Sequence, residues 1–154
     1  MTKKERAKLI VTTLKTEYPD AICSLFYDEP WQLLVSVRLS AQCTDARVNI
    51  VTKDLFKKYP TIDSLAYADI LEVTDIVRPC GLGPSKARDI CAALKMILNT
   101  YDGRIPDTMD ELLSLPGVGR KSANLILGDV YHKPAIVTDT HCIRLSSRLG
   151  LTDG

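Results

Sequence analysis

The chain contains 154 residues, of which 45% are apolar and 25% are charged. These proportions are typical of a globular domain with a buried core, and they exclude a disordered or low-complexity chain. The formal net charge is only +1. Binding to nucleic acid therefore cannot be argued from overall charge and must rest on basic residues that cluster locally.

The cysteines and the apolar segments exclude several further classes of protein. The five cysteines are odd in number and form no Cys-x-x-Cys pair, which argues against a disulfide framework and against a metal site in this chain. No apolar run reaches the length of a signal peptide or the ~20 residues that span a bilayer. We expect a soluble, unexported protein in a reducing cytoplasm, with no membrane partner.

Apolar periodicity and turn residues predict five helices in the first 80 residues. They are expected at residues 3–17, from Pro30 to about Leu39, from Thr44 or Asp45 to near Tyr59, at 64–67 and at 69–78. Proline is favourable in the first turn of a helix, as at Pro30. The helix that follows it is apolar almost all round, so we expect it to be a central buried helix.

A glycine turn, Gly81-Leu82-Gly83, precedes the next predicted helix. Apolar residues from Ala87 to Tyr101 mark this helix, which ends at Gly103. Leu82 stands between two glycines, so it cannot easily belong to the core. The same spacing of glycines returns 36 residues later, which suggests that the chain uses one device twice.

The second glycine turn has a predicted helix on each side and forms a helix-hairpin-helix pattern. Thr108 and Glu111 have the spacing of a capping box, in which each side chain satisfies a backbone N–H at the start of a helix. This short helix should run to Ser114. After the turn, residues 123–130 carry one apolar stripe at helical spacing.

This hairpin is suited to bind an anion. Gly117 and Gly119 can adopt positive φ and allow a phosphate to approach the backbone. The N–H groups of the hairpin and of the next helical turn lie at the positive end of a helix dipole. Lys121 falls in that turn, where the dipole and Arg120 disfavour a positive charge and favour a nucleophilic amine.

Each of these residues also has a purely structural explanation. Gly-x-Gly turns are common, and a lysine in a first helical turn is usually a solvated charge. Asp139 precedes a short predicted helix, where aspartate is a preferred N-cap. Only residues 135–138 resemble a strand. The residues alone predict an all-α bundle with short connections and leave its function open.

Several motifs resemble those of the endonuclease III family of helix-hairpin-helix DNA glycosylases. They are Leu39-Ser40-Ala41-Gln42-Cys43-Thr44-Asp45, Gly81-Leu82-Gly83-Pro84-Ser85-Lys86-Ala87, and Leu115-Pro116-Gly117-Val118-Gly119-Arg120-Lys121-Ser122-Ala123-Asn124 with Asp139 18 residues after Lys121. Their order and spacing match the family, and the resemblance extends from about residue 20 to the end. It implies a helical bundle with two lobes around a DNA-binding cleft. Residues 23–134 would form a helical-barrel lobe that holds the hairpin, and residues 1–22 with 135–154 a partial second lobe.

The resemblance implies base-excision repair of double-stranded DNA with a damaged or abasic site. Enzymes of this family remove oxidised pyrimidines and cleave the strand by β-elimination, through a Schiff base on a lysine. On this chain the lysine is Lys121, and Asp139 assists it as the second catalytic residue. Gln42 and Leu82 would fill the space left by a flipped nucleotide. The remaining DNA-binding residues are Gly117, Val118, Gly119 and Arg120.

Two alternatives stay open beside this hypothesis. A related mismatch-specific glycosylase would use water, although such enzymes lack a lysine at this place. A non-catalytic or impaired helix-hairpin-helix fragment would bind DNA without reacting. The family usually carries a 4Fe-4S cluster in a C-terminal part that this chain lacks, so no cofactor is expected here. We expect the partial second lobe to allow self-association, and the protein to lie in the cytoplasm, at the nucleoid if the source is bacterial.

Overall fold

The computed structural model describes residues 1–153 of the chain, and within that range every regular element is helical. The contacts divide the chain into two compact units. One unit joins Met1–Cys23 to Val137–Gly154, and the other is Ser24–Ile136. The boundaries predicted from the sequence, 22/23 and 134/135, lie within two residues of these. The strand-like residues 135–138 form no strand.

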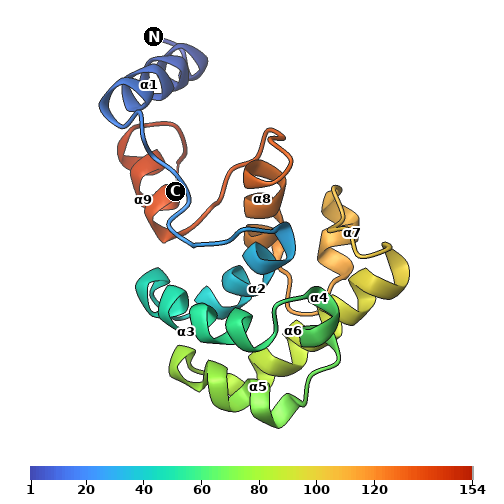
Figure 1. Cartoon of the computed structure of the whole chain (residues 1–154). Helices are drawn as coiled ribbons and strands as arrows, with labels where there is room; N and C mark the ends of the chain where they lie inside the picture. The colour runs from blue at the N-terminus through green and yellow to red at the C-terminus, as the bar shows by residue number, and fades with distance from the viewer. Residues whose placement is uncertain (154) are drawn as a thin grey trace. The chain divides into compact units, whose positions relative to one another are not determined.

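Within the larger unit the helices follow one another with connections of eight residues or fewer, whereas longer connections lead from α1 to α2 and from α8 to α9 (Figure 1). They are α1 (Lys3–Glu17), α2 (Pro30–Ser40), α3 (Asp45–Lys58), α4 (Ile62–Ala66), α5 (Ile70–Val77), the 3-10 turn η1 (Arg78–Cys80), α6 (Gly83–Thr100), α7 (Met109–Ser114), α8 (Arg120–Asp129) and α9 (Thr140–Arg148). The predicted all-α class is therefore confirmed. None of the described helices is long and apolar enough to cross a membrane.

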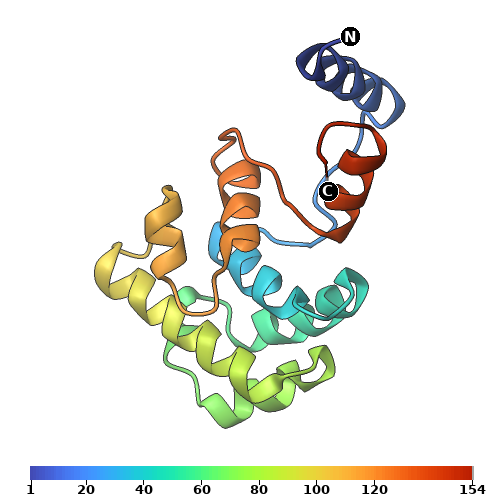
Figure 2. The same ribbon diagram turned by 180° about the vertical axis from the view of Figure 1, so that it is seen from behind.

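Helix α2 is the centre of the larger unit, as its all-round apolar sequence predicts. Leu33 and Leu39 are completely buried, and Val35 is nearly so. The helix packs against α3, α6 and α8, while α6 also packs against α4 and α5. Figure 2 shows this arrangement from behind, with α6 (yellow-green to yellow) alongside α5 (light green). The two segments that carry the glycine turns are therefore attached to one core.

Local capping explains most of the helix boundaries. Thr44 caps α3, with its side chain accepting the N–H of Arg47. The capping box predicted at Thr108 is only half formed. Thr108 accepts the N–H of Glu111, but the Glu111 carboxylate accepts the Thr108 hydroxyl at 2.6 Å rather than a backbone N–H.

The smaller unit has little covered surface of its own. No residue of α1 or α9 is buried. Polar contacts join the two ends of the chain, with Arg6 donating to the carbonyl of Gly150 at 3.3 Å and Lys3 lying 3.5 Å from Asp153. About half of the surface is exposed on each of Leu9, Val11, Leu14, Ile143, Leu145 and Leu149. Apolar helix faces of this kind are available for contact with another surface.

Candidate functional site

The hairpin between α7 and α8 leaves the start of α8 open. Helix α8 begins at Arg120, and its N-cap residue, Gly119, has no side chain with which to cap it. The first N–H groups of a helix have no partner within that helix, so those of α8 are available to an outside acceptor. Arg120 and Lys121, which follow the hairpin directly, are both exposed. This end of α8 is suited to bind an anion.

The two glycines of the hairpin have different conformations. Gly117 has a φ of +74°, as the sequence predicted, but Gly119 has an ordinary φ of −98°. Gly119 does not use the positive φ that is open to glycine, because the chain has already turned at Gly117 and enters α8 in an extended conformation. A Cβ atom added at Gly119 would meet no atom within 4 Å. The backbone at Gly119 therefore borders open space at the start of α8.

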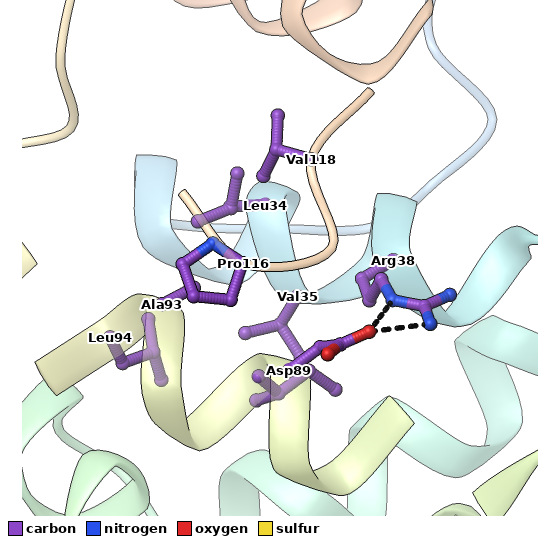
Figure 3. A pocket seen from close by; sticks show the side chains of 9 residues that line it. Leu34, Val35, Arg38, Asp89, Ala93, Leu94, Pro116 and Val118 are labelled. Carbon is purple, nitrogen blue, oxygen red and sulfur yellow. Dashed lines mark hydrogen bonds and ion pairs between the residues drawn. The ribbon is translucent and has the colours of Figure 1, made fainter. Parts of the chain in front are cut away.

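Val118 contributes to the hairpin in a way that the sequence did not predict. Its N–H donates to the carbonyl of Leu115 at 3.1 Å, so this group is not available to a ligand. Its side chain lies with Pro116 over α2 and α6, next to Leu34 (Figure 3). The hairpin N–H groups are therefore not all open to an anion, because that of Val118 is used within the turn, while the Val118 side chain packs the hairpin onto the core.

An ion pair lies beneath the turn. Arg38 of α2 donates through Nε and Nη2 to Oδ2 of Asp89 of α6, at 2.9 and 2.7 Å (Figure 3). A Cβ atom at Gly117 would lie 2.7 Å from Arg38 Nε and 2.8 Å from Asp89 Cβ. The space left among these side chains is about 10 Å³, about enough for one water molecule. The hairpin is therefore closely packed against α2 and α6 here, and the remaining space is too small for a ligand larger than water.

Gln42 and Leu82 are both exposed residues in left-handed backbone conformations. Gln42 follows α2 with a φ of +55°, and Leu82 precedes α6 with a φ of +52°. Leu82 keeps 57% of its surface exposed, as its place between two glycines predicted. The two glycine turns differ in backbone conformation. The first has positive φ at both Gly81 and Leu82, whereas the second has it at Gly117.

Asp139 is the N-cap of α9 in the smaller unit. Its Oδ1 accepts the N–H of Cys142 at 2.7 Å, which is the structural role that the sequence allows. Its side chain is half-buried, while Lys121 belongs to the larger unit. The larger unit thus holds Gln42, Leu82 and the hairpin, and the smaller one holds Asp139.

Comparison with known proteins identifies the family. Residues 35–154 match the model of the HhH-GPD superfamily base excision DNA repair protein. Endonuclease III of Synechocystis sp. is 50% identical over 151 residues, which cover 97% of this chain and 69% of that protein. Endonuclease III of Bacillus subtilis is 45% identical over 134 residues, or 87% of this chain and 61% of that one. The chain belongs to the endonuclease III family.

Solved structures agree with this assignment. A non-covalent endonuclease III–DNA complex has a TM-score of 0.88 and 43% identity, and the match covers 97% of this chain and 70% of that one. A trapped endonuclease III–DNA covalent intermediate gives the same values. A thermostable thymine-DNA glycosylase, with a TM-score of 0.84 and 21% identity over 94% of this chain and 68% of that one, shares the fold. The predicted family, helix-hairpin-helix fold and enzyme class, a DNA glycosylase and AP lyase of base excision repair, are confirmed.

The cysteines of this chain are not arranged to hold an iron–sulfur cluster. Among residues 1–153, no three His, Cys, Asp or Glu side chains are grouped so that they could hold a metal ion. The cysteines are distributed over both units, and Cys80 and Cys91 are buried in the core of the larger one. A 4Fe-4S cluster needs four cysteine thiolates around one centre. These residues do not fit the cluster, and no step below uses one.

The sequence reasoning missed one residue of the site, Lys86. It is completely buried, and it contacts the backbone just before Gln42 and just before Gly81. Its place in the Gly81–Ala87 motif was the available signal. Position 86 also lies at helical spacing before Ile90 and Ala93, on the buried stripe of α6, but charged side chains are rarely fully buried, so a lysine there was not expected to be interior.

Proposed function

We propose that this chain binds double-stranded DNA at a damaged or abasic site, excises an oxidised pyrimidine and cleaves the strand through Lys121. The observation that supports it most is the position of Lys121, exposed in the first turn of α8, directly after a hairpin that leaves that turn uncapped. A phosphate bound at the N-terminal end of α8 would hold the DNA backbone beside this amine. The trapped covalent intermediate of a 43% identical endonuclease III adds support.

The proposed reaction uses the lysine amine as a nucleophile. The Lys121 Nζ lone pair attacks C1′ of the sugar, the bond from C1′ to the base breaks, and the base leaves with that electron pair and takes up a proton. Opening of the sugar ring gives a Schiff base between Nζ and C1′. Loss of a proton from C2′ then expels the 3′ phosphate, which cleaves the strand. Hydrolysis of the Schiff base frees the lysine.

Asp139 would serve this reaction in one of two ways. Its carboxylate can take a proton from the lysine ammonium, or it can stabilise positive charge that develops on the sugar. Its bond to the Cys142 N–H uses Oδ1 and fixes the direction of the carboxyl group at the start of α9.

Exposed residues on the larger unit would keep the DNA open. A base inside a duplex is unreachable, so a glycosylase must extrude the target nucleotide. Gln42 and Leu82 are exposed on short connections that join buried helices, and they would occupy the vacated space. Gly117, Gly119 and Arg120 would contact phosphate, with Val118 supporting them from below. Such a substrate implies work in the cytoplasm, at the nucleoid of a bacterium.

Exchange of Lys121 for glutamine tests the proposal. Lys121→Gln should abolish strand cleavage and borohydride trapping on abasic duplex DNA, and should keep the affinity for DNA within a few-fold, since phosphate contacts come mainly from backbone N–H groups. Lys53→Gln removes the same charge from the exposed side of α3 and should keep full trapping. Full cleavage by Lys121→Gln contradicts the assignment.

Exchange of Asp139 separates catalysis from capping. Asp139→Asn should lose base excision and keep its fold, because asparagine caps helices nearly as well as aspartate. Loss of the fold with unchanged activity per folded molecule would reduce Asp139 to a cap. The alternative, a DNA-binding protein without catalysis, has one observation in its favour, the lack of buried residues in α1 and α9 of the unit that carries Asp139. Binding by the wild-type chain without any trapping would select it.

A further inference from the structure

Lys86 is the largest fully buried side chain of the larger unit, with no exposed surface. Its ammonium group can donate three hydrogen bonds, and it makes three. Nζ donates to the carbonyl oxygens of Leu39 at 2.8 Å, Ala41 at 2.7 Å and Cys80 at 2.8 Å. A buried charge is costly unless such partners satisfy it. No described carboxylate forms an ion pair with it.

The three carbonyl groups belong to two segments that the sequence separates by about forty residues. Leu39 and Ala41 end α2, and the next residue is Gln42. Cys80 ends η1, and Leu82 follows two residues later. The last carbonyl groups of a helix have no partner within it and lie at its negative end, which favours a cation. Lys86 therefore binds the end of α2 to the end of η1.

The backbone at both ends is of a kind that needs support. Gln42 and Leu82 have φ values of +55° and +52°, which non-glycine residues rarely adopt. Such conformations persist where surrounding contacts hold them. Burial lowers the pKa of Lys86, an effect that the neighbouring Cys80 and Cys43 thiols oppose. A side chain that is buried and bonded in this way has a defined position.

We propose that Lys86 is a positioning residue that fixes Gln42 and Leu82 relative to each other, so that both enter the duplex together at a damaged site. The inference rests on the proposed function, in which these two side chains fill the space of the extruded nucleotide. Groups held in place before binding lose less conformational entropy when they bind. Without Lys86 each segment would still exist, but their spacing would vary.

The test uses the full chain and duplex DNA with a tetrahydrofuran abasic analogue, which is bound and not cleaved. Affinity is measured for this duplex and for the same duplex without damage. Lys86→Met removes the donors and keeps an unbranched side chain of similar length. It should reduce the preference for the abasic duplex at least tenfold, with affinity for undamaged DNA within threefold, because phosphate contacts remain. Lys86→Gln keeps two N–H donors and should give an intermediate loss.

Two controls separate positioning from general stability. Ile97→Ala truncates another completely buried side chain of α6, and it should lower both affinities by the same factor. Hydrogen exchange of amides 41–43 and 80–82 should accelerate in Lys86→Met and stay unchanged in Ile97→Ala. A Lys86→Met protein with normal preference for the abasic duplex would overturn the inference, as would an equal loss on both duplexes.

A double-mutant cycle shows whether Lys86 acts through the two residues that it supports. In a chain that carries Gln42→Ala and Leu82→Ala, adding Lys86→Met should change the preference less than threefold. The same tenfold loss in this background would overturn the inference. If Gln42→Ala with Leu82→Ala leaves the preference unchanged, the role proposed for those two residues fails and the inference fails with it, while trapping through Lys121 still tests the proposed reaction.

Discussion

At the scale of single residues, the hairpin glycines show two different reasons for lacking a side chain. Gly117 needs a left-handed backbone and lies against Arg38 and Asp89, which leave no space for a Cβ atom. Gly119 needs neither, because its φ is ordinary and its surroundings are empty. The first glycine is required by the fold, whereas the second leaves open space beside the start of α8.

This difference predicts opposite effects of two alanine substitutions. Gly117→Ala should lower the free energy of unfolding by about 1 to 3 kcal/mol, since it combines a strained φ with a close contact. Gly119→Ala should change it by less than about 1 kcal/mol and should weaken DNA binding, because a methyl group would occupy the space next to the first turn of α8. Urea unfolding and binding titrations measure the two effects. Equal stability of the two variants contradicts the prediction.

The Cys80 thiol should make the free energy of unfolding depend on pH in the alkaline range. Burial raises its pKa from 9.0 to about 11. Between these values the unfolded chain has lost the thiol proton and the folded chain keeps it, so the free energy of unfolding falls as the pH rises. The loss from this group should be roughly 2 to 3 kcal/mol at 1.36 kcal/mol for each pH unit. Lys86, whose pKa is lowered, acts in the opposite direction.

A matched variant isolates the contribution of Cys80. Urea unfolding of the wild type and of Cys80→Ala is compared between pH 8 and 11 under reducing conditions. The advantage of the wild type over the variant should shrink across this range by the amount given above. A constant difference between the two proteins would show that the thiol titrates normally. The carbonyl group that receives Lys86 belongs to the backbone and is kept.

At the scale of elements, the hairpin is held by contacts with α2 and α6 in addition to its own hydrogen bond from Val118 to Leu115. Pro116 and Val118 lie over both helices, and the pair of Arg38 and Asp89 connects the helices beneath Gly117 (Figure 3). The side chains of this pair are 19% and 32% exposed, so water screens them only in part. The position of the proposed phosphate site is therefore set by helix packing.

The ion pair beneath the hairpin predicts a specific pattern of stability. Arg38→Met leaves the Asp89 carboxylate half-buried and unpaired, and should cost about 1 to 2 kcal/mol. Adding Asp89→Leu should recover most of this loss, because an apolar pair can replace a buried ion pair. Arg78→Met removes an exposed pair with Asp75 and should cost less than about 0.5 kcal/mol. Equal losses for Arg38→Met and Arg78→Met, measured by thermal unfolding, would contradict this account.

At the scale of the whole molecule, the smaller unit exposes apolar side chains without burying any residue in its two helices. We infer that this unit associates with a second copy when the chain is alone in solution, because several large apolar side chains on its two helices are about half exposed. Sedimentation should show a dimer or larger species that forms as concentration rises. Leu14→Glu should weaken it, and Leu71→Glu, at a 75% exposed leucine of the other unit, should not.

Two results would contradict the prediction of self-association through the smaller unit. A monomer at every concentration, with strong protection of residues 3–17 and 140–148 from hydrogen exchange, would show that the unit is stable by itself. Association that Leu14→Glu and Leu71→Glu weaken equally would place the contact elsewhere. Hydrogen exchange reports the local opening that a poorly packed unit would undergo.

Much of the fold could be predicted because helix limits depend on nearby residues. Pro30, Thr44 and Thr108 each mark a helix start through bonds or dihedral preferences within one turn. Errors were also local. Helix α4 begins two residues before its predicted start because Thr61 and Ser64 cap each other, a box that serine forms less often than glutamate.

The site divides in the same way between sequence and tertiary structure. The three motifs and Asp139, in their order and spacing along the chain, were enough to predict the family, because each motif is a local pattern. Lys86 bonds to the carbonyl group of Ala41, 45 positions away. Arg38 and Asp89, which form an ion pair, are 51 positions apart. Such contacts depend on how α2 and α6 pack, and no property of either helix alone reveals them. Local sequence patterns were thus sufficient for the family and for the residues proposed to react, whereas the side chains that contact the backbone beside Gln42 and Leu82 and lie under the hairpin become apparent only in the packed fold.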